Sequence, residues 1–67
     1  MHLTINGELQ AFEAPMTVAA LLSRLAIDRR KVAVERNLAL VQRGSFDTVL
    51  LEDGDRIEIV AFIGGGM

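Results

Sequence analysis

Residues 2–12, HLTINGELQAF, hold the strongest local signal in the sequence, because Asn6-Gly7 separates two short runs that contain apolar residues. Asparagine and glycine both adopt positive φ readily, as a two-residue type I′ hairpin loop requires. Such a loop pairs Ile5 with Glu8. This register places the polar side chains of Glu8 and Gln10 on the face that is expected to be buried, so a slightly longer loop stays open as an alternative. The apolar side chains expected to share the inner face are Leu3, Ile5 and Phe12.

The next segment, residues 14–28 (APMTVAALLSRLAID), predicts a helix of about 9 to 11 residues. Thr17 can act as its N-cap, because a threonine hydroxyl accepts a hydrogen bond from a free amide of the first turn. Pro15 precedes the helix, where its missing N–H costs nothing. Apolar residues at i, i+3, i+4 and i+7 form one stripe, which indicates a face packed on a core. The stripe consists of Val18, Leu21, Leu22 and Leu25.

Residues 31–42, KVAVERNLALVQ, alternate as a half-buried strand does, with Val32 and Val34 on one side and Ala33 and Glu35 on the other. Asn37 is expected to turn the chain into a second short strand over residues 38–41. The following stretch is less regular. Phe46 is predicted to anchor it under a loop.

A turn at residues 53–55, Asp-Gly-Asp, precedes a final strand expected over residues 56–63. Ile57 and Ile59 should face the helix stripe. Val60 and Phe62 then fall on the opposite, open face, where two neighbouring apolar side chains make a candidate docking patch. The alternative is that a loop covers them.

The order hairpin, helix, strand, strand, final strand predicts an α+β fold, with a mixed four- to five-stranded sheet and one helix packed on one face. With 67 residues, the chain is long enough for one domain only, expected over residues 1–63. Residues 64–67, Gly-Gly-Gly-Met, are expected to form a flexible C-terminal tail. The chain has no cysteine, so neither a disulfide nor a thiolate metal site can support it.

The charge pattern excludes several classes of partner. The net charge is −2, and the only basic cluster, Arg29-Arg30-Lys31, is best explained as a solvated loop, so nucleic acid is not expected to bind. No apolar run is long enough for a membrane span, and no leader is recognisable, so a complete cytoplasmic protein is expected. The single histidine, His2, lacks a catalytic partner. Residues 52–55 offer too few ligands for a cation, so no metal, bound cofactor or catalytic residue is predicted.

The segments LTINGE, TVAALLSRL, VAVERN and LEDGDRIEIV, followed by GGG, occur in an order that resembles the ThiS family. These proteins are ubiquitin-like β-grasp sulfur carriers of thiamine biosynthesis, and the resemblance extends to Gly66. It implies a carrier and not an enzyme. Two other interpretations stay open: the small subunit of molybdopterin synthase, which is also a sulfur carrier, and a non-catalytic β-grasp module that binds protein or RNA.

The resemblance also implies how the carrier works. An E1-like adenylating enzyme of the ThiF type uses MgATP to form an acyl-adenylate on Gly66, and a sulfur nucleophile converts it to a thiocarboxylate. Gly64 and Gly65 form the arm that threads into the partner, while Val60, Phe62 and Ile63 dock the folded body. A thiazole synthase of the ThiG type then takes the sulfur into the thiazole ring.

Met67 departs from the family pattern, because it leaves Gly66 without a free carboxylate. Either a protease removes Met67 or the residue is an addition to the natural chain. In both cases the active form is expected to end at Gly66.

Overall fold

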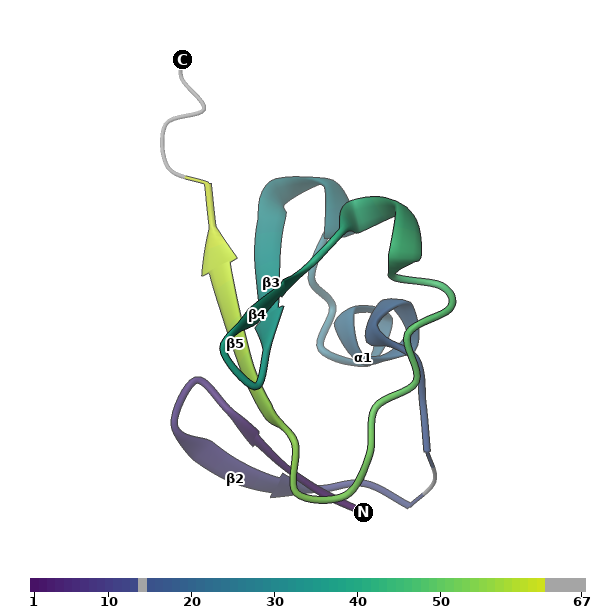
Figure 1. The fold of residues 1–67 in the computed structure, drawn as a ribbon, viewed down its shortest axis with the longest axis vertical. Helices are drawn as coiled ribbons and strands as arrows, with labels where there is room; N and C mark the ends of the chain where they lie inside the picture. The colour runs from purple at the N-terminus through teal and green to yellow at the C-terminus, as the bar shows by residue number, and fades with distance from the viewer. Residues whose placement is uncertain (14, 63–67) are drawn as a thin grey trace.

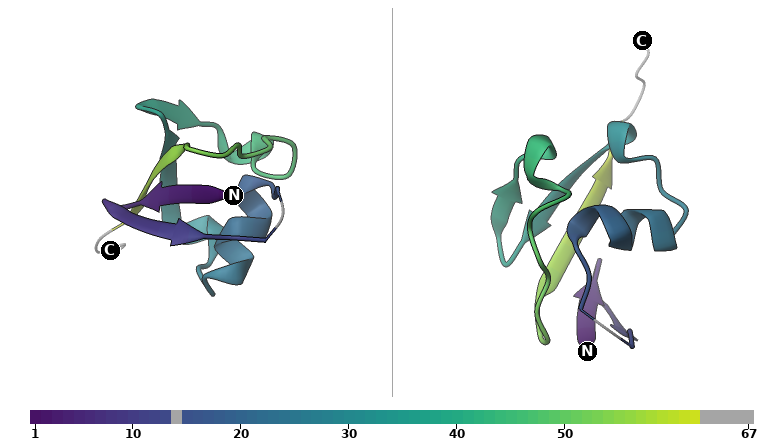
Figure 2. Two further views of the ribbon diagram at one scale, coloured as in Figure 1. Left: turned by 90° about the horizontal axis from the view of Figure 1, so that it is seen from below. Right: turned by 90° about the vertical axis from the view of Figure 1, so that its right-hand side faces the viewer.

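The chain folds around a five-stranded mixed sheet that carries one α-helix on one face (Figure 1). The structure is a computed structural model and describes residues 1–13 and 15–62. The strand order is β2-β1-β5-β3-β4, so the last strand of the chain lies in the centre of the sheet. Figure 2 shows the helix crossing one face of the sheet while the other face stays open. The elements, in chain order, are β1 (His2–Ile5), β2 (Glu8–Ala11), α1 (Val18–Arg24), η1 (Arg29–Lys31), β3 (Val32–Arg36), β4 (Ala39–Val41), η2 (Arg43–Ser45) and β5 (Arg56–Ala61).

The first hairpin has the two-residue loop that its sequence predicts, and the longer alternative is wrong. Asn6 and Gly7 adopt φ values of 50° and 83°, as a type I′ turn requires. The turn sets the register, in which Ile5 lies opposite Glu8. Glu8 remains exposed, because β2 is an edge strand and its side chains lie at the margin of the sheet.

The helix begins where predicted but is shorter than predicted. The amide of Ala20 donates to the Thr17 hydroxyl over 3.1 Å, which confirms the N-cap. The helix spans 7 residues instead of 9 to 11, because Ala26 adopts a left-handed φ of 60°. The amide of Ile27 then donates to the Leu22 carbonyl over 2.9 Å, the capping bond of a Schellman motif. Sequence inspection missed this end, since the motif normally carries glycine.

Replacing Ala26 with glycine (Ala26→Gly) is expected to stabilise the fold. A left-handed backbone conformation costs a residue with a Cβ about 1–2 kcal/mol, and glycine avoids this cost. Glycine is also more flexible in the unfolded chain, and this loss of entropy on folding offsets about half of the gain. The free energy of unfolding should therefore rise by about 0.5–1 kcal/mol, which raises the midpoint of thermal unfolding by roughly 2–8 °C. Circular dichroism melting measures the change, and an unchanged or lower midpoint contradicts it.

The central strand β5 joins the two halves of the sheet. It pairs parallel to β1 through Arg56 and Ile57 and antiparallel to β3 along residues 57–61. Ile57 is fully buried in the same core as the apolar face of α1, and Phe46 is buried beneath its loop, both as predicted. The buried apolar core comprises Leu3, Ile5, Phe12, Val18, Leu21, Leu22, Val32, Val34, Val41, Phe46, Leu51 and Ile57.

The turn between β3 and β4 differs from its prediction. Residue 38 was expected to begin the second strand, but β4 begins at Ala39. Asn37 and Leu38 instead form a two-residue turn, with φ values of 51° and 72°. Asparagine tolerates this region of backbone space, whereas leucine does so rarely. The unfavoured residue explains why the sequence pattern placed the turn one residue too early.

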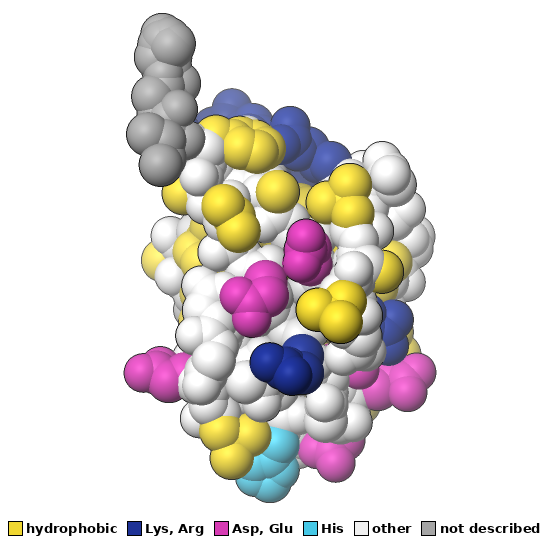
Figure 3. Space-filling model, turned by 60° about the vertical axis from the view of Figure 1, so that its left-hand side comes forward, with side chains coloured by type: hydrophobic (Ala, Val, Ile, Leu, Met, Phe, Trp, Pro, Cys, Tyr) yellow, Lys and Arg dark blue, Asp and Glu magenta, His cyan; other side chains and the backbone are white. Residues whose placement is uncertain are grey.

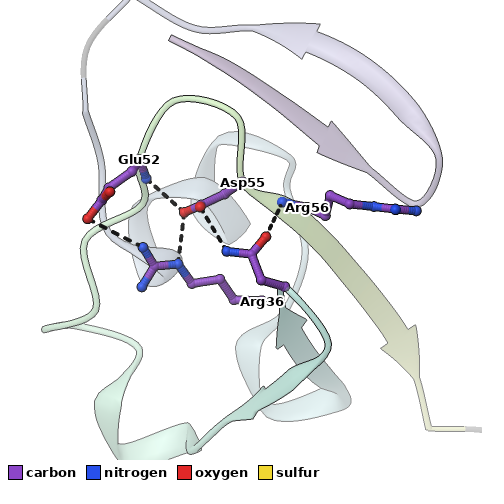
Figure 4. Close-up of polar contacts among 5 residues, drawn as sticks. Arg36, Glu52, Asp55 and Arg56 are labelled. Carbon is purple, nitrogen blue, oxygen red and sulfur yellow. Dashed lines mark hydrogen bonds and ion pairs between the residues drawn. The ribbon is translucent and has the colours of Figure 1, made fainter.

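A buried carboxylate ties this turn to the loop before β5 (Figure 4). Asp55 is only 7% exposed and accepts hydrogen bonds from Arg36 Nε at 2.8 Å, Asn37 Nδ2 at 3.0 Å and the Glu52 amide at 2.8 Å. The Asn37 side-chain oxygen accepts in turn from the Arg56 amide at 2.9 Å. Burial raises the pKa of Asp55, but these hydrogen bonds together with the charge of Arg36 outweigh it, and the net pKa lies below its usual value.

Candidate functional site

The candidate site lies where β5 approaches the C-terminus. Val60 lies opposite Ala33 of β3. Phe62 follows the last residue of β5, and its amide donates a hydrogen bond of 2.9 Å to the Lys31 carbonyl. The ladder therefore holds the chain in an extended conformation as far as Phe62. The remaining predicted site residues, Ile63, Gly64, Gly65 and Gly66, together with Met67, lie outside the described residues.

Val60 and Phe62 lie uncovered on the open face of the sheet, with exposures of 58% and 53%. No loop of the described chain covers them, so the two side chains of the predicted docking patch are exposed. Leu40 of β4 joins them on this face, because it lies opposite the outward-facing Glu35 and is 61% exposed. Figure 3 shows hydrophobic side chains gathered toward one end of this view of the molecule.

Arg43 of η2 holds the Phe62 ring in place. Its guanidinium carbon lies 5.5 Å from the ring centroid, within the range of a cation–π contact. The same guanidinium reaches the Val32 carbonyl at 3.5 Å. Phe62, Arg43 and Leu40 also line a hollow of about 180 Å³ at the edge of β3 and β4. An exposed aromatic ring held beside a hollow is suited to protein contact.

Two glutamates meet in the middle of the open face. Glu35 of β3 lies directly opposite Glu58 of β5, and neither has an ion-pair partner among residues 1–13 and 15–62. Opposed side chains on one sheet face have Cβ atoms about 4.5–5.5 Å apart, so the like charges repel. Figure 3 shows acidic side chains beside hydrophobic ones in the middle of one face of the molecule. A partner that brings a basic group over the pair removes this repulsion.

Sequence inspection found part of this face and missed the rest. Alternation along the final strand predicted that Val60 and Phe62 face outward. It did not reveal that Glu58 opposes Glu35, because the pairing register of two distant strands is not encoded in either strand alone. Arg43 was missed because it lies on a 3₁₀ turn with no periodic pattern to mark its direction.

The basic cluster at residues 29–31 is largely paired with carboxylates. It forms the 3₁₀ turn η1 in place of the predicted loop. Arg29 pairs with Asp47 through contacts of 3.1 and 2.8 Å, and Arg30 pairs with Asp28. The hydrogen bond from Arg30 lowers the pKa of Asp28 to about 2, and that from Arg29 lowers the pKa of Asp47. Two of the three basic charges are therefore already matched by carboxylates.

The remaining candidate residues from the sequence are His2 and the acidic residues among 52–55, and these make contacts within the fold. His2 is exposed, its amide donates to Asp53 over 2.6 Å, and its ring lies 3.7 Å from the same carboxylate. Across the described part of the chain, no three metal-ligating side chains come together. None of the helices in residues 1–13 and 15–62 has the length and apolar character to cross a membrane.

Comparison with known proteins gives a consistent family. The chain matches the ThiS family over residues 3–66. It is similar to a thiazole synthase of Paramagnetospirillum magneticum, with 61% identity over 66 residues that make up 98% of this chain and 20% of that protein. It is also similar to the sulfur carrier protein ThiS of Bacillus subtilis, with 40% identity over 50 residues, 75% of this chain and 76% of the relative. The chain thus spans only a fifth of the length of the thiazole synthase.

Among solved structures, the chain is similar to the crystal structure of the thiamine biosynthesis protein (ThiS) from Geobacter metallireducens. The TM-score is 0.86 and the identity 36%, over 98% of this chain and 100% of that one. This likeness confirms the predicted β-grasp fold.

Proposed function

The chain belongs to the ThiS family of thiamine-biosynthesis sulfur carriers, which are not enzymes, and from this premise we propose that Gly66 is the residue that carries the sulfur. A single observation supports the assignment most directly. The family match runs through Gly66 and stops before Met67. Gly66 is therefore the last residue that the family model matches, which supports it as the end of the form that carries sulfur.

The proposed chemistry takes place in three steps, beginning at the Gly66 carboxylate. In the first, a carboxylate oxygen attacks the α-phosphorus of MgATP bound to an adenylating enzyme of the ThiF type, and pyrophosphate leaves. In the second, the terminal sulfur of a persulfide attacks the acyl carbon and AMP leaves. A thiol then cleaves the sulfur–sulfur bond, which frees the thiocarboxylate and leaves the donor as a disulfide. The carrier supplies only the end group.

The glycines at 64 and 65 suit the arm that this chemistry needs. Gly66 lies four positions beyond Phe62 in the sequence, and a fully extended chain covers about 3.3–3.6 Å per residue. The reacting carboxylate can therefore reach at most about 14 Å from Phe62. A narrow channel of this depth excludes side chains, and glycine also adopts the backbone angles of two different active sites.

The open face is the proposed docking surface for the adenylating enzyme, through Val60, Phe62 and the neighbouring Ile63. Apolar groups with a central acidic pair, Glu35 and Glu58, match a partner surface that presents apolar pockets and a basic group. Ordering the tail costs about 1–2 kcal/mol per residue. Burial of Val60 and Phe62 against the enzyme offsets this cost.

A thiazole synthase of the ThiG type is the proposed acceptor of the sulfur. The support is that relatives named thiazole synthase contain a segment similar to this whole chain as a fifth of their length. A carrier segment and a synthase in one protein indicate that the two act together. Because the cycle consumes MgATP, the proposal places it in the cytoplasm.

The test compares the chain ending at Gly66 with the chain that keeps Met67. Each is incubated with the adenylating enzyme, MgATP and a persulfide donor, and intact mass spectrometry follows the product. The chain ending at Gly66 should gain one sulfur in place of one oxygen, whereas the longer chain should stay unmodified unless Met67 is first removed. Equal loading of both chains, or of neither, contradicts the assignment of Gly66.

A further inference from the structure

Leu38 is an outlier in this fold on two counts. It occupies the second position of the turn between β3 and β4 with a φ of +72°, in the left-handed region. Its side chain is also 87% exposed, the highest value among the large hydrophobic residues of the described chain. Both features are unfavourable in the isolated protein.

The isolated fold does not account for leucine at this position. Asn37 precedes it, and the Asn-Gly pair is the preferred sequence for a two-residue turn of this kind. Glycine at 38 relieves the backbone strain and removes an exposed apolar group. Strain that the fold itself does not need is an indication of function.

Leu38 lies within reach of a partner that docks on the open face. It is at the tip of the hairpin that also carries Leu40, beside the Arg56 end of β5. The six-residue step from Phe62 back to Arg56 along an extended strand covers about 20 Å. A standard interface buries about 800 Å² on each partner, a patch roughly 30 Å across. One docked enzyme can therefore cover both ends of the sheet.

We propose that Leu38 is a docking residue for the adenylating enzyme, which receives its side chain in an apolar pocket at the far end of the interface from Phe62. The proposal rests on the proposed function. A second copy of this chain is a poorer occupant, because a two-fold dimer on this face brings the Glu35–Glu58 pairs of two acidic chains together. An enzyme with basic groups on its docking surface avoids that repulsion.

The decisive variant is Leu38→Gly, with Ala26→Gly as its matched control. Both relieve a left-handed backbone, but Ala26 follows α1, away from the open face. Leu38→Gly should lower the equilibrium constant for unfolding roughly fivefold. It should also raise the Kd for the adenylating enzyme by roughly tenfold or more, as expected when a buried leucine side chain is lost. Ala26→Gly should stabilise the fold and leave the Kd unchanged.

Circular dichroism melting and isothermal titration calorimetry, on chains ending at Gly66, supply the two readouts. Leu38→Met retains an apolar side chain and should keep the Kd within about threefold of the wild-type value. A more stable Leu38→Gly chain that binds as tightly as the wild type overturns the proposal for Leu38 and leaves the proposed function intact. If the wild-type chain does not bind the enzyme, both the proposal for Leu38 and the proposed function are overturned. Sedimentation that shows Leu38-dependent self-association, with an unchanged Kd, assigns the residue to a second copy and also overturns the proposal.

Discussion

Removal of Gly65 and Gly66, so that the chain ends at Gly64, is expected to abolish sulfur loading and leave the midpoint of thermal unfolding unchanged. The shortened chain still ends in a glycine carboxylate, so the chemistry of the end group is the same. Its reach is shorter by about 7 Å, since each extended residue covers about 3.3–3.6 Å. A carboxylate displaced this far from the α-phosphate cannot react, because even 1 Å of misplacement costs about 100-fold in rate.

Intact mass spectrometry measures loading, and circular dichroism melting measures stability. Stability should not change because the described sheet ends at Ala61 and the buried core lies within residues 3–57. Gly65→Ala in the chain ending at Gly66 keeps the reach but adds one methyl group, so it separates the need for length from the need for a bare backbone, and its loading should also fall. A shortened chain that is loaded at the wild-type rate contradicts the threading arm. A large drop in its melting midpoint contradicts a tail separate from the core.

The second large effect is expected from Asp55→Asn, which should lower the free energy of unfolding by about 3 kcal/mol. The change removes the charge that pairs with Arg36 and turns one acceptor oxygen into a donor that faces other donors. Domains of this size are stable by only about 3–10 kcal/mol, so the variant should be substantially less stable. Urea unfolding followed by circular dichroism suits the measurement, since the chain has no tryptophan or tyrosine.

The effect of Asp55→Asn should also depend on pH. The folded-state pKa of Asp55 lies below its ordinary value, which is about 3.9 in the unfolded chain. The stabilisation by the carboxylate is therefore complete above that value and is lost as the pH falls through the folded-state pKa. The difference in stability between wild type and Asp55→Asn should be constant from pH 7 to about 5 and should narrow below about 4.

Asp47→Asn is the matched control for this prediction. Asp47 also accepts two hydrogen bonds from an arginine, but its side chain is 69% exposed, so water replaces much of what is lost. If the free energy of unfolding changes little for Asp47→Asn and much for Asp55→Asn, the burial of Asp55 is the cause of the difference. Equal effects contradict the argument.

Local features of the sequence predicted their parts of the fold because each depends on only a few neighbouring residues. Asn6-Gly7 predicted the turn of the first hairpin, although its register stayed open between two loop lengths, and Thr17 marked the start of the helix. Predictions failed where a residue adopts a conformation that its type disfavours. Ala26 ends the helix early and Leu38 delays β4, both with positive φ. No composition rule signals such positions, since neighbouring contacts impose the backbone angle.

The fold class, the outward direction of Val60 and Phe62 and the glycine-rich end could all be predicted from the amino-acid sequence, because periodicity and backbone freedom are properties of short segments. Which side chains meet depends on how the folded chain brings distant segments together. The parallel pairing of β1 with β5, the contact of Arg43 with Phe62, the opposition of Glu35 and Glu58 and the burial of Asp55 all join segments distant in sequence. Such contacts follow from how the whole chain buries its apolar surface, and no short segment specifies that.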